Sequence, residues 1–386
     1  MPNLVGIGNS QVPTNGMLGG LAYEDSSVLD QVRSGRKNMI INGDMRICQR
    51  FNVNTANNIN NATHTYHVDR FKAYESTDGI LQGEWENDNY SDAGFQYSVK
   101  YTPASTDTSL ANNQFAFISQ VIEMENMRHL AYGLSYAKTC TLSFYVKSNK
   151  TGTYCIQLIN DGTNNRQFVT EYRINNTNTW ERKEITIPGD TSGTWNSNGL
   201  RIAWTLAVAG NRQTSTVGSW QSSGTAYYGT NNIVNFMNNT NNTFHLTGVQ
   251  FEIGENATDF EHISYGDSLM RCYRYYVKLY TNTSDFPFGY GYKYSSTAHA
   301  MSVPLPTRMR TTPSAQISNI RVRGGNTNGQ NLSENVSSFG GMTFSFGNFQ
   351  SFTANTSSNV LVEGTSTMLT NAVSNSSSYI NFDAEI

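Results

Sequence analysis

Three aromatic side chains stand in polar stretches of the sequence, where they could form a surface that binds sugars. Trp195, Trp220 and Tyr228 lie among Asn, Gln, Ser and Gly residues. Sugar recognition needs exposed aromatic faces beside hydrogen-bonding side chains. We therefore predict these three as carbohydrate-binding residues, with ordinary packing or a subunit interface as the alternative. Trp204 belongs to an alternating strand and is expected in the core.

A second aromatic group alternates strictly with small or polar residues. Tyr290, Tyr292 and Tyr294 are separated by Gly291 and Lys293. Alternate residues of a strand point to the same face, so the three rings would share one face. We expect this face to lie in a core or in a subunit contact, and a ligand site is the alternative.

No arrangement typical of an enzyme is evident in the sequence. The one candidate pair of carboxylates for glycoside cleavage is Glu84 and Glu86. Two residues apart on a strand, they would point the same way, and a solvated strand face explains them better. His64 and His67 would face opposite sides of a strand, which prevents chelation of zinc. We therefore predict no catalytic residues, and a protein that binds rather than an enzyme.

The composition narrows the class of protein. Of 386 residues, 14% are charged and 12% are aromatic, and the formal net charge is -3. This neutral polar character suits an exposed surface that meets sugars. A nucleic-acid partner is not expected, because it would require a basic patch. Membrane insertion is not expected either, because the sequence has no apolar run of about 18 residues.

The cysteines and the N-terminus indicate where the chain is made. The four cysteines form no metal-binding or redox pair: Cys48, Cys140, Cys155 and Cys272. If residues 148–152 turn a hairpin, Cys140 faces Asn160 rather than Cys155. We therefore expect free thiols, which fits a reducing cytoplasm. The N-terminus has no signal-peptide pattern. These features together fit a virion protein synthesised in the host cytoplasm.

Alternation of apolar and polar residues from residue 38 onward predicts an all-β chain. Examples are residues 115–121, 140–147 and 200–208. This pattern favours an antiparallel sandwich in which each sheet has one solvent-exposed face. Long polar loops are predicted near residues 54–61 and 210–228.

A break near residue 266 separates this sandwich from a second β domain. Leu269 and Cys272 are at helical spacing, and Asp267 or Ser268 can cap a short helix at residues 266–272. The strands predicted after it include residues 300–305, 316–323, 342–346 and 379–386. At the other end of the chain, residues 1–37 are rich in turn residues and poor in apolar ones, so they should form an extended segment.

Several motifs resemble bacteriophage tail-fibre proteins. Asn42-Gly43-Asp44 resembles the opening of their carbohydrate-binding-module jelly roll, and residues 248–261 resemble its closing strand. Residues 267–276 look like the Arg-Cys-x-Arg-Tyr-Tyr junction that follows this module. Residues 303–313 and the end of the chain look like the C-terminal tip domain. The resemblance covers about residues 38–386.

The resemblance implies a domain order and a metal site. The expected order is an N-terminal virion-attachment segment at 1–37, a jelly-roll β-sandwich at 38–265 and a C-terminal β-sandwich tip domain at 266–386. Some of these modules carry a structural Ca²⁺, for which the matching carboxylates are Asp44, Glu252 and Asp259. Arg46 stands where a further acidic residue is usual, and turn capping by Asp44 and Asp259 is the alternative. No other cofactor is implied.

The resemblance also implies a function, which is that of a tail fibre binding a glycan on the host surface. We expect a homotrimer located on the virion, with its N-terminus attached to other tail or virion proteins. The apolar anchors expected for that attachment are Leu4, Val5, Ile7, Leu18, Leu21 and Tyr23. A head fibre or capsid decoration protein is the alternative, and a polysaccharide depolymerase is a third class.

Overall fold

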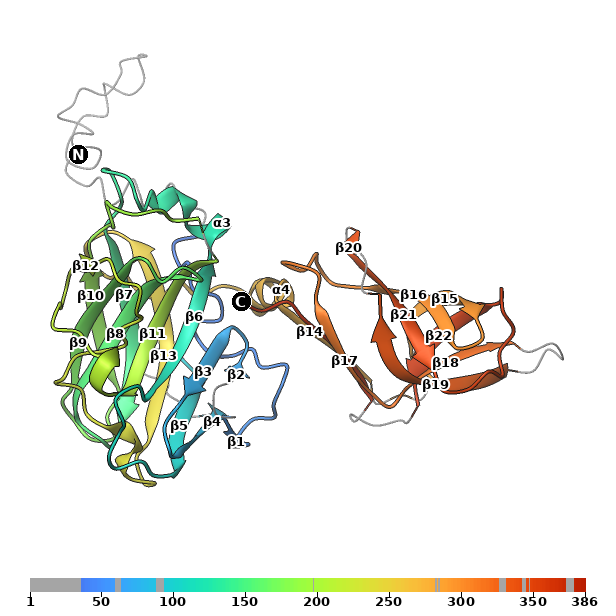
Figure 1. Cartoon of the computed structure of the whole chain (residues 1–386), viewed down its shortest axis with the longest axis horizontal. Helices are drawn as coiled ribbons and strands as arrows, with labels where there is room; N and C mark the ends of the chain where they lie inside the picture. Colours follow the sequence, from blue (N-terminus) through green and yellow to red (C-terminus); the bar gives the residue numbers. More distant parts are fainter. Residues whose placement is uncertain are drawn as a thin grey trace, which may run out of the picture.

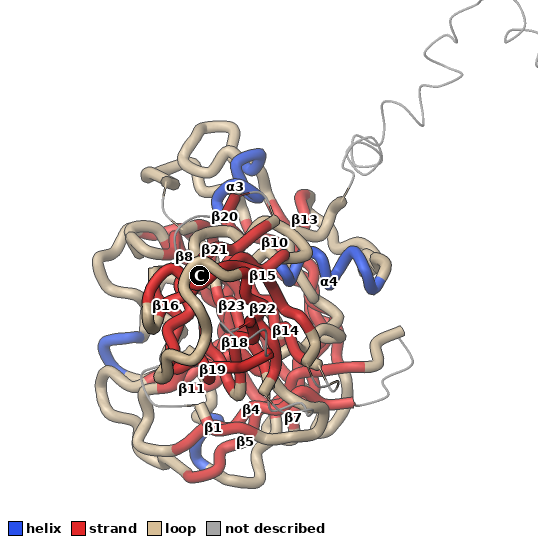
Figure 2. Tube along the Cα trace, turned by 90° about the vertical axis from the view of Figure 1, so that its right-hand side faces the viewer, coloured by secondary structure: helices blue, strands red, loops and turns tan. Residues whose placement is uncertain are grey.

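A computed structural model of the chain describes most of its residues. The described ranges are 36–59, 64–87, 94–196, 198–281, 283, 285–325, 331–341, 345–346, 348–372 and 378–386. The six predicted attachment anchors between Leu4 and Tyr23 lie outside them. The described chain is nearly all β, as the alternation predicted, and its helices are short segments beside a body of strands (Figure 2).

The first unit is a jelly-roll sandwich of two antiparallel sheets (Figure 1). The first sheet contains, in spatial order, β1 (Asn57–Asn58), β4 (Ile80–Asn87), β5 (Tyr97–Ser105), β13 (Phe244–Ile253), β7 (Cys140–Ser148) and β10 (Glu181–Ile187). The second contains β12 (Trp220–Gln221), β9 (Gln167–Ile174), β8 (Gly152–Asp161), β11 (Gly199–Val208), β6 (Phe115–Glu123), β3 (Phe71–Glu75) and β2 (Thr65–Val68). Short helical turns connect them: α3 (Met124–Met127), η2 (Arg128–Leu130), η3 (Gly210–Arg212) and η4 (Phe236–Asn238).

The inward-pointing apolar residues of both sheets form one core, in which Trp204 is fully buried as predicted. The prediction of one solvent-exposed face per sheet fails for central strands of both sheets, because β13 in the first sheet and β6, β8 and β11 in the second are buried on both sides. The polar segment 210–230 covers the outer side of the strands in the second sheet. Gln157 on β8 donates to the Tyr227 carbonyl at 2.6 Å, and Thr205 on β11 donates to the Tyr228 carbonyl at 2.5 Å. These bonds explain how a polar loop can cover a sheet.

The opening motif joins the start of the jelly roll to its last strand. The Asn38 side chain donates to the Val249 carbonyl at 3.0 Å and accepts from the Phe251 amide at 3.1 Å. Gly43 lies so close to β13 that a Cβ there would be 2.1 Å from the Val249 oxygen. Any side chain at residue 43 would therefore push the two ends of the module apart.

The four cysteines are free thiols, as predicted. The reasoning from a hairpin at residues 148–152 was wrong, however. Strand β7, which carries Cys140, belongs to the first sheet, and β8, which carries Cys155, belongs to the second. The turn therefore crosses the sandwich instead of pairing its two flanking strands.

Helix α4 (Tyr265–Tyr273) connects the two units, close to the predicted position. Its cap is Ser264, whose hydroxyl accepts from the Asp267 amide at 3.1 Å, and not Asp267 or Ser268. The buried side of α4 packs Cys272 with Ile41, Ile47 and Tyr275. The helix is thus anchored on the jelly roll before the chain enters the second unit.

The second unit has two sheets. The smaller sheet contains β14 (Tyr276–Tyr280), β23 (Tyr379–Asp383) and β17 (Ser314–Ser318). The larger sheet contains β16 (Ala298–Pro304), β15 (Pro287–Ser295), β22 (Ser366–Asn371), β18 (Ile320–Gly325), β19 (Asn331–Gly340) and β21 (Phe349–Thr356), with β20 (Ser345–Phe346) at its end. Because β21 also pairs with β16, six of these strands close into a barrel.

This barrel replaces the second sandwich that the tip-domain resemblance implied. The smaller sheet packs on it, and both contribute to one apolar core that is separate from that of the jelly roll. The single strand predicted at 316–323 is two strands, β17 and β18, in different sheets. The chain turns between them at Asn319, whose φ is 51°. The predicted strand at 342–346 is described only as β20, because 342–344 lie outside the described residues.

Candidate functional site

Two of the three predicted sugar-binding residues lie together in the jelly roll. The rings of Trp195 and Trp220 meet edge to face with centroids 5.6 Å apart, and both contact Tyr132. Their indole N–H groups are used internally: Trp195 donates to the Asp190 carboxylate at 3.0 Å, and Trp220 donates to the Pro188 carbonyl at 2.6 Å. Both side chains are half-buried. They hold loops together, and part of each side chain stays exposed.

Tyr228 does not join them. Its side chain is only 8% exposed and stacks on Phe115 and Phe117, with ring centroids 4.1 and 5.1 Å away. These residues form an apolar cluster under the loop that covers the second sheet. The prediction of Tyr228 as part of an exposed platform is therefore corrected, because a buried, stacked ring offers no face to a sugar.

The predicted calcium ligands are not assembled into one site. The Asp44 carboxylate forms an ion pair with Arg46 at 2.9 Å. The Glu252 carboxylate accepts from the Thr258 amide and hydroxyl at 2.9 and 2.7 Å. Asp259 contributes its backbone carbonyl to Lys37 at 2.6 Å. Among the described residues, no group of three or more His, Cys, Asp and Glu side chains could hold a metal ion. The carboxylates present do not fit the calcium site that the resemblance implied.

The carboxylate pair on β4 faces a lysine. Lys100 on β5 forms ion pairs with Glu84 at 3.6 Å and with Glu86 at 3.1 Å. Burial alone would raise the pKa of Glu86, but its hydrogen bond and ion pair with His245, and those with Lys100, outweigh burial and lower it to about 2. Glu86 is thus an ionised, fully engaged carboxylate, which is unsuited to act as a general acid.

Three exposed aromatic side chains lie on β15 of the barrel. Tyr290, Tyr292 and Tyr294 are 63, 53 and 49% exposed. They share one face of the strand, as their alternation predicted, but that face points outward and not into a core. We call these three residues the tyrosine face.

Small neighbours leave room beside these rings. Tyr292 lies opposite Ala300 on β16 and Ser366 on β22, and Tyr290 lies opposite Ser302 and Met368. On the opposite face, a Cβ at Gly291 would be 1.8 Å from the Ala300 oxygen, so only glycine permits this close pairing of β15 with β16. Ala300, Ser302 and Ser366 are short, so a flat ligand can approach the rings from their side, while Met368 borders Tyr290.

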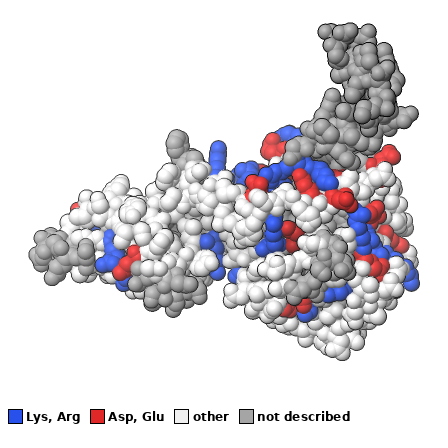
Figure 3. Space-filling model, turned by 180° about the vertical axis from the view of Figure 1, so that it is seen from behind, with Lys and Arg blue, Asp and Glu red and all other residues white. Residues whose placement is uncertain are grey.

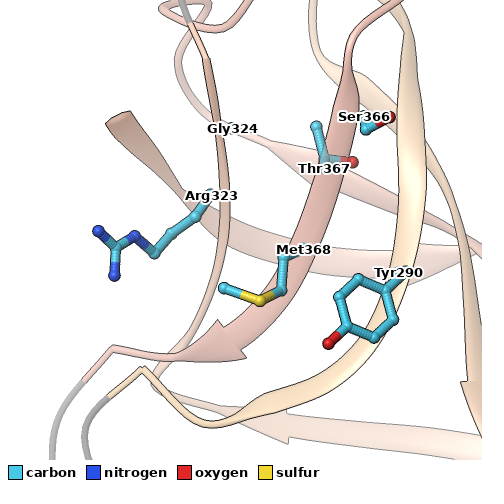
Figure 4. A pocket seen from close by; sticks show the side chains of 6 residues that line it. All are labelled: Tyr290, Arg323, Gly324, Ser366, Thr367 and Met368. Atoms are coloured by element: carbon cyan, nitrogen blue, oxygen red, sulfur yellow. The ribbon is translucent and has the colours of Figure 1, made fainter. Parts of the chain in front are cut away.

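A pocket of about 340 Å³ adjoins this face (Figure 4). Arg323, Met368 and Tyr290 lie in a row across β18, β22 and β15, because Met368 pairs with both of the other residues. Figure 4 shows Tyr290 and Arg323 on either side of Met368, with Ser366 and Thr367 further along β22. The pocket thus combines an aromatic ring, a guanidinium group and the Ser366 hydroxyl, the kinds of group that bind sugars and their substituents, while the Thr367 hydroxyl is buried and donates to Met301.

A buried charge network inside the barrel supports β15 from beneath. Lys293 is fully buried and donates to Glu334 on β19 at 2.8 Å and to Asn359 at 2.9 Å. Glu334 also accepts from His299 at 3.0 Å and from Thr356 at 2.8 Å. Because Lys293 is held inside, its neighbours Tyr292 and Tyr294 are directed to the outside of the barrel.

Sequence reasoning did not identify Arg323, Met368 or this internal network as parts of a site. One signal was present, because Arg321 and Arg323 are two residues apart and so share a strand face. Arg323 comes near Tyr290 only because β22, which is distant from β18 in the sequence, lies between β18 and β15.

Among the described residues, no helix is long and apolar enough to cross a membrane.

Comparisons with known proteins were made at three levels. No protein-family model matches the chain, and no curated protein sequence matches it. Among solved structures, the enzymatically active domain of tailspike protein 4 from bacteriophage CBA120 is similar, with 14% identity and a TM-score of 0.29. That match covers 56% of this chain and 21% of the tailspike chain, about a fifth of its length.

Carbohydrate-binding modules also match. A family 4 module has 14% identity and a TM-score of 0.26 over 55% of this chain and 98% of the module. The family 11 module of a cellulosomal cellulase from Clostridium thermocellum has 12% identity and a TM-score of 0.28, over 51% of this chain and 99% of the module. These similarities are too distant to assign a function to this chain.

Proposed function

We propose that this chain is a structural virion protein of a bacteriophage, a tail fibre that binds a glycan on the host surface through the tyrosine face. The observation that carries the proposal is the outward presentation of Tyr290, Tyr292 and Tyr294 above short side chains. Aromatic rings exposed in this way bind the apolar faces of sugars. The tail-fibre role is supported by the sequence motifs of the jelly roll and the junction.

The position of the tyrosine face suits a receptor-binding tip. The first described residues contact the jelly roll, where Lys37 donates to Thr258 at 2.6 Å. Arg36 forms an ion pair at 3.5 Å with Asp267 of α4, so this contact lies beside the junction of the two units. The barrel extends from that junction away from the jelly roll (Figure 1), which leaves its surface free to meet a receptor.

Removing a ring from the tyrosine face should weaken glycan binding. We expect Tyr292→Thr to lower affinity about fivefold, because one aromatic contact contributes about 1 kcal/mol. Threonine keeps the strand propensity of the site. Affinity is measured by biolayer interferometry against a panel of immobilised bacterial capsular polysaccharides and lipopolysaccharides. Tyr280→Thr is the matched control, because Tyr280 is also exposed but lies on β14 of the smaller sheet.

Three results would contradict this proposal. In the first, the wild-type protein is folded but binds none of the polysaccharides, which would favour the capsid-decoration alternative. Tyr292→Thr and Tyr280→Thr could bind as tightly as the wild type while Trp220→Phe lost binding, which would move the site to the jelly roll. Retained polysaccharide could acquire new reducing ends, which would make the protein a depolymerase.

We further propose that the fibre is a homotrimer that attaches to other virion proteins through residues 1–37. Outside the tyrosine face, the second unit exposes further large apolar side chains that suit a subunit contact: Phe286, Phe349 and Val360. Light scattering should give the mass of three chains, both with and without residues 1–37. Deletion of these residues should also abolish incorporation into particles. A monomer at micromolar concentration, or normal incorporation of the truncated chain, would contradict the respective proposal.

A further inference from the structure

The charged groups beside the tyrosine face are unevenly balanced. Asp285 forms ion pairs with both Arg321 and Arg323, the latter at 2.7 Å. Among the described residues, it is the one carboxylate within 4.0 Å of either guanidinium group. Two positive charges therefore share one negative charge, which leaves one positive charge in excess at the edge of the pocket.

These charges are accessible to a ligand. The Arg321, Arg323 and Asp285 side chains are 25, 30 and 39% exposed. The face of the molecule in Figure 3 shows most charged side chains over the first unit and few over the barrel. The sequence of the second unit contains few other charged residues, so the local excess of positive charge favours an anionic partner.

We propose that the glycan bound at the tyrosine face is anionic, and that Arg323 contacts its carboxylate or phosphate substituent while Tyr290 packs on a sugar ring. This inference rests on the proposed function and adds the chemical class of the ligand. Met368 on β22 lies between Arg323 on β18 and Tyr290 on β15, so one ligand can contact both residues. A guanidinium group suits the acidic substituent because its planar donors match a carboxylate or a phosphate.

Two substitutions with opposite expected effects test the inference. Arg323→Gln removes the excess charge and should weaken binding of the retained polysaccharide at least about tenfold, because the loss of a hydrogen bond to a charged group reaches the roughly 1.4 kcal/mol that a tenfold change represents. Asp285→Asn leaves both arginines without their carboxylate and should strengthen binding. Arg308→Gln is the matched control, because Arg308 is exposed in the same unit but outside the pocket. It should leave affinity unchanged.

Chemical modification of the polysaccharide identifies the acidic group. Carboxyl reduction should abolish the effect of Arg323→Gln if the group is a carboxylate, and dephosphorylation should do so if it is a phosphate. The inference is overturned if both treated forms bind as tightly as the intact polymer, if Asp285→Asn weakens binding, or if Arg308→Gln weakens it as much as Arg323→Gln. In each of these cases, a loss of binding in Tyr292→Thr would still support glycan recognition. If the wild-type protein retains no polysaccharide, the proposed function itself fails.

Discussion

Replacing Glu334 with glutamine should lower the free energy of unfolding of the barrel by about 3–5 kcal/mol, because it leaves a buried lysine without its counter-charge. Lys293 is fully buried, and Glu334 is 1% exposed. Glu334 also accepts from the amides of Val360 and Leu361 at 2.7 and 2.8 Å. The substitution therefore weakens the support of the loop after β21 as well as the lysine.

Chemical denaturation followed by tyrosine fluorescence measures this loss. Glu363→Gln is the matched control, because Glu363 is an exposed glutamate of the same unit. Lys293→Met should lower the free energy of unfolding by less than Glu334→Gln does, because Glu334 then keeps its four other hydrogen-bond donors. Equal stability of the wild type and Glu334→Gln, or a larger loss in Lys293→Met, would show that the network does not hold the barrel as described.

The same network predicts how the barrel responds to acid. Burial would raise the pKa of Glu334, but Lys293, the Leu361 amide, Thr356 and His299 outweigh it and lower this pKa from 4.5 to about 2. Since the folded-state pKa is the lower one, the stabilisation is complete above pH 4.5 and is lost as the pH falls toward 2. The loss over this window is on the order of 3 kcal/mol. In Glu334→Gln, the stability of the barrel should depend less on pH in this window.

The outward direction of the tyrosine face shows what alternation can and cannot predict. The sequence places Tyr292 and Tyr294 on one strand face and Lys293 on the other. The usual preference buries tyrosine and exposes lysine. The barrel reverses this, because Glu334 on β19 neutralises the buried lysine. Glu334 alternates with Leu332 and Val336, so the local pattern places it on the apolar face of β19, although its charge favours an exposed position.

Strand positions were predicted better than strand partners, because alternation is a local pattern and pairing depends on residues that are distant in the sequence. Strands β6, β7 and β11 follow from their own alternation, which is a local property. The partner of β7 is set by distant contacts, and so the hairpin expected across residues 148–152 does not exist. The burial of Tyr228 likewise depends on Phe115 and Phe117, which are far away in the sequence. Of the predicted sugar-binding residues, only the proximity of Trp195 and Trp220 is therefore found in the structure.

The end of the chain forms a charged cluster between the two units. Residues 383–386 return to the junction (Figure 1), and Glu385 forms ion pairs with Arg50 and Arg70 of the jelly roll. Arg70 is 2% exposed, stacks over the Tyr275 ring at 3.5 Å and donates to the Val121 carbonyl at 2.8 Å. Its one carboxylate partner among the described residues is Glu385. This contact is one of several that join the second unit to the jelly roll, together with the ion pair of Arg274 with Glu123.

Glu385→Gln should loosen this junction, because it leaves the buried Arg70 without a carboxylate, at a cost of about 3–5 kcal/mol. The jelly roll and the barrel have separate cores, so each should stay folded while the amides of 383–386 exchange faster with deuterium. Asp383→Asn is the matched control: Asp383 also contacts Arg50, at 3.1 Å, but is 39% exposed, so its loss should cost no more than about 1 kcal/mol. If exchange at 383–386 is unchanged in Glu385→Gln, Glu385 does not hold the units together. If it is faster while the affinity for polysaccharide is kept, the tyrosine face acts independently of its orientation on the fibre.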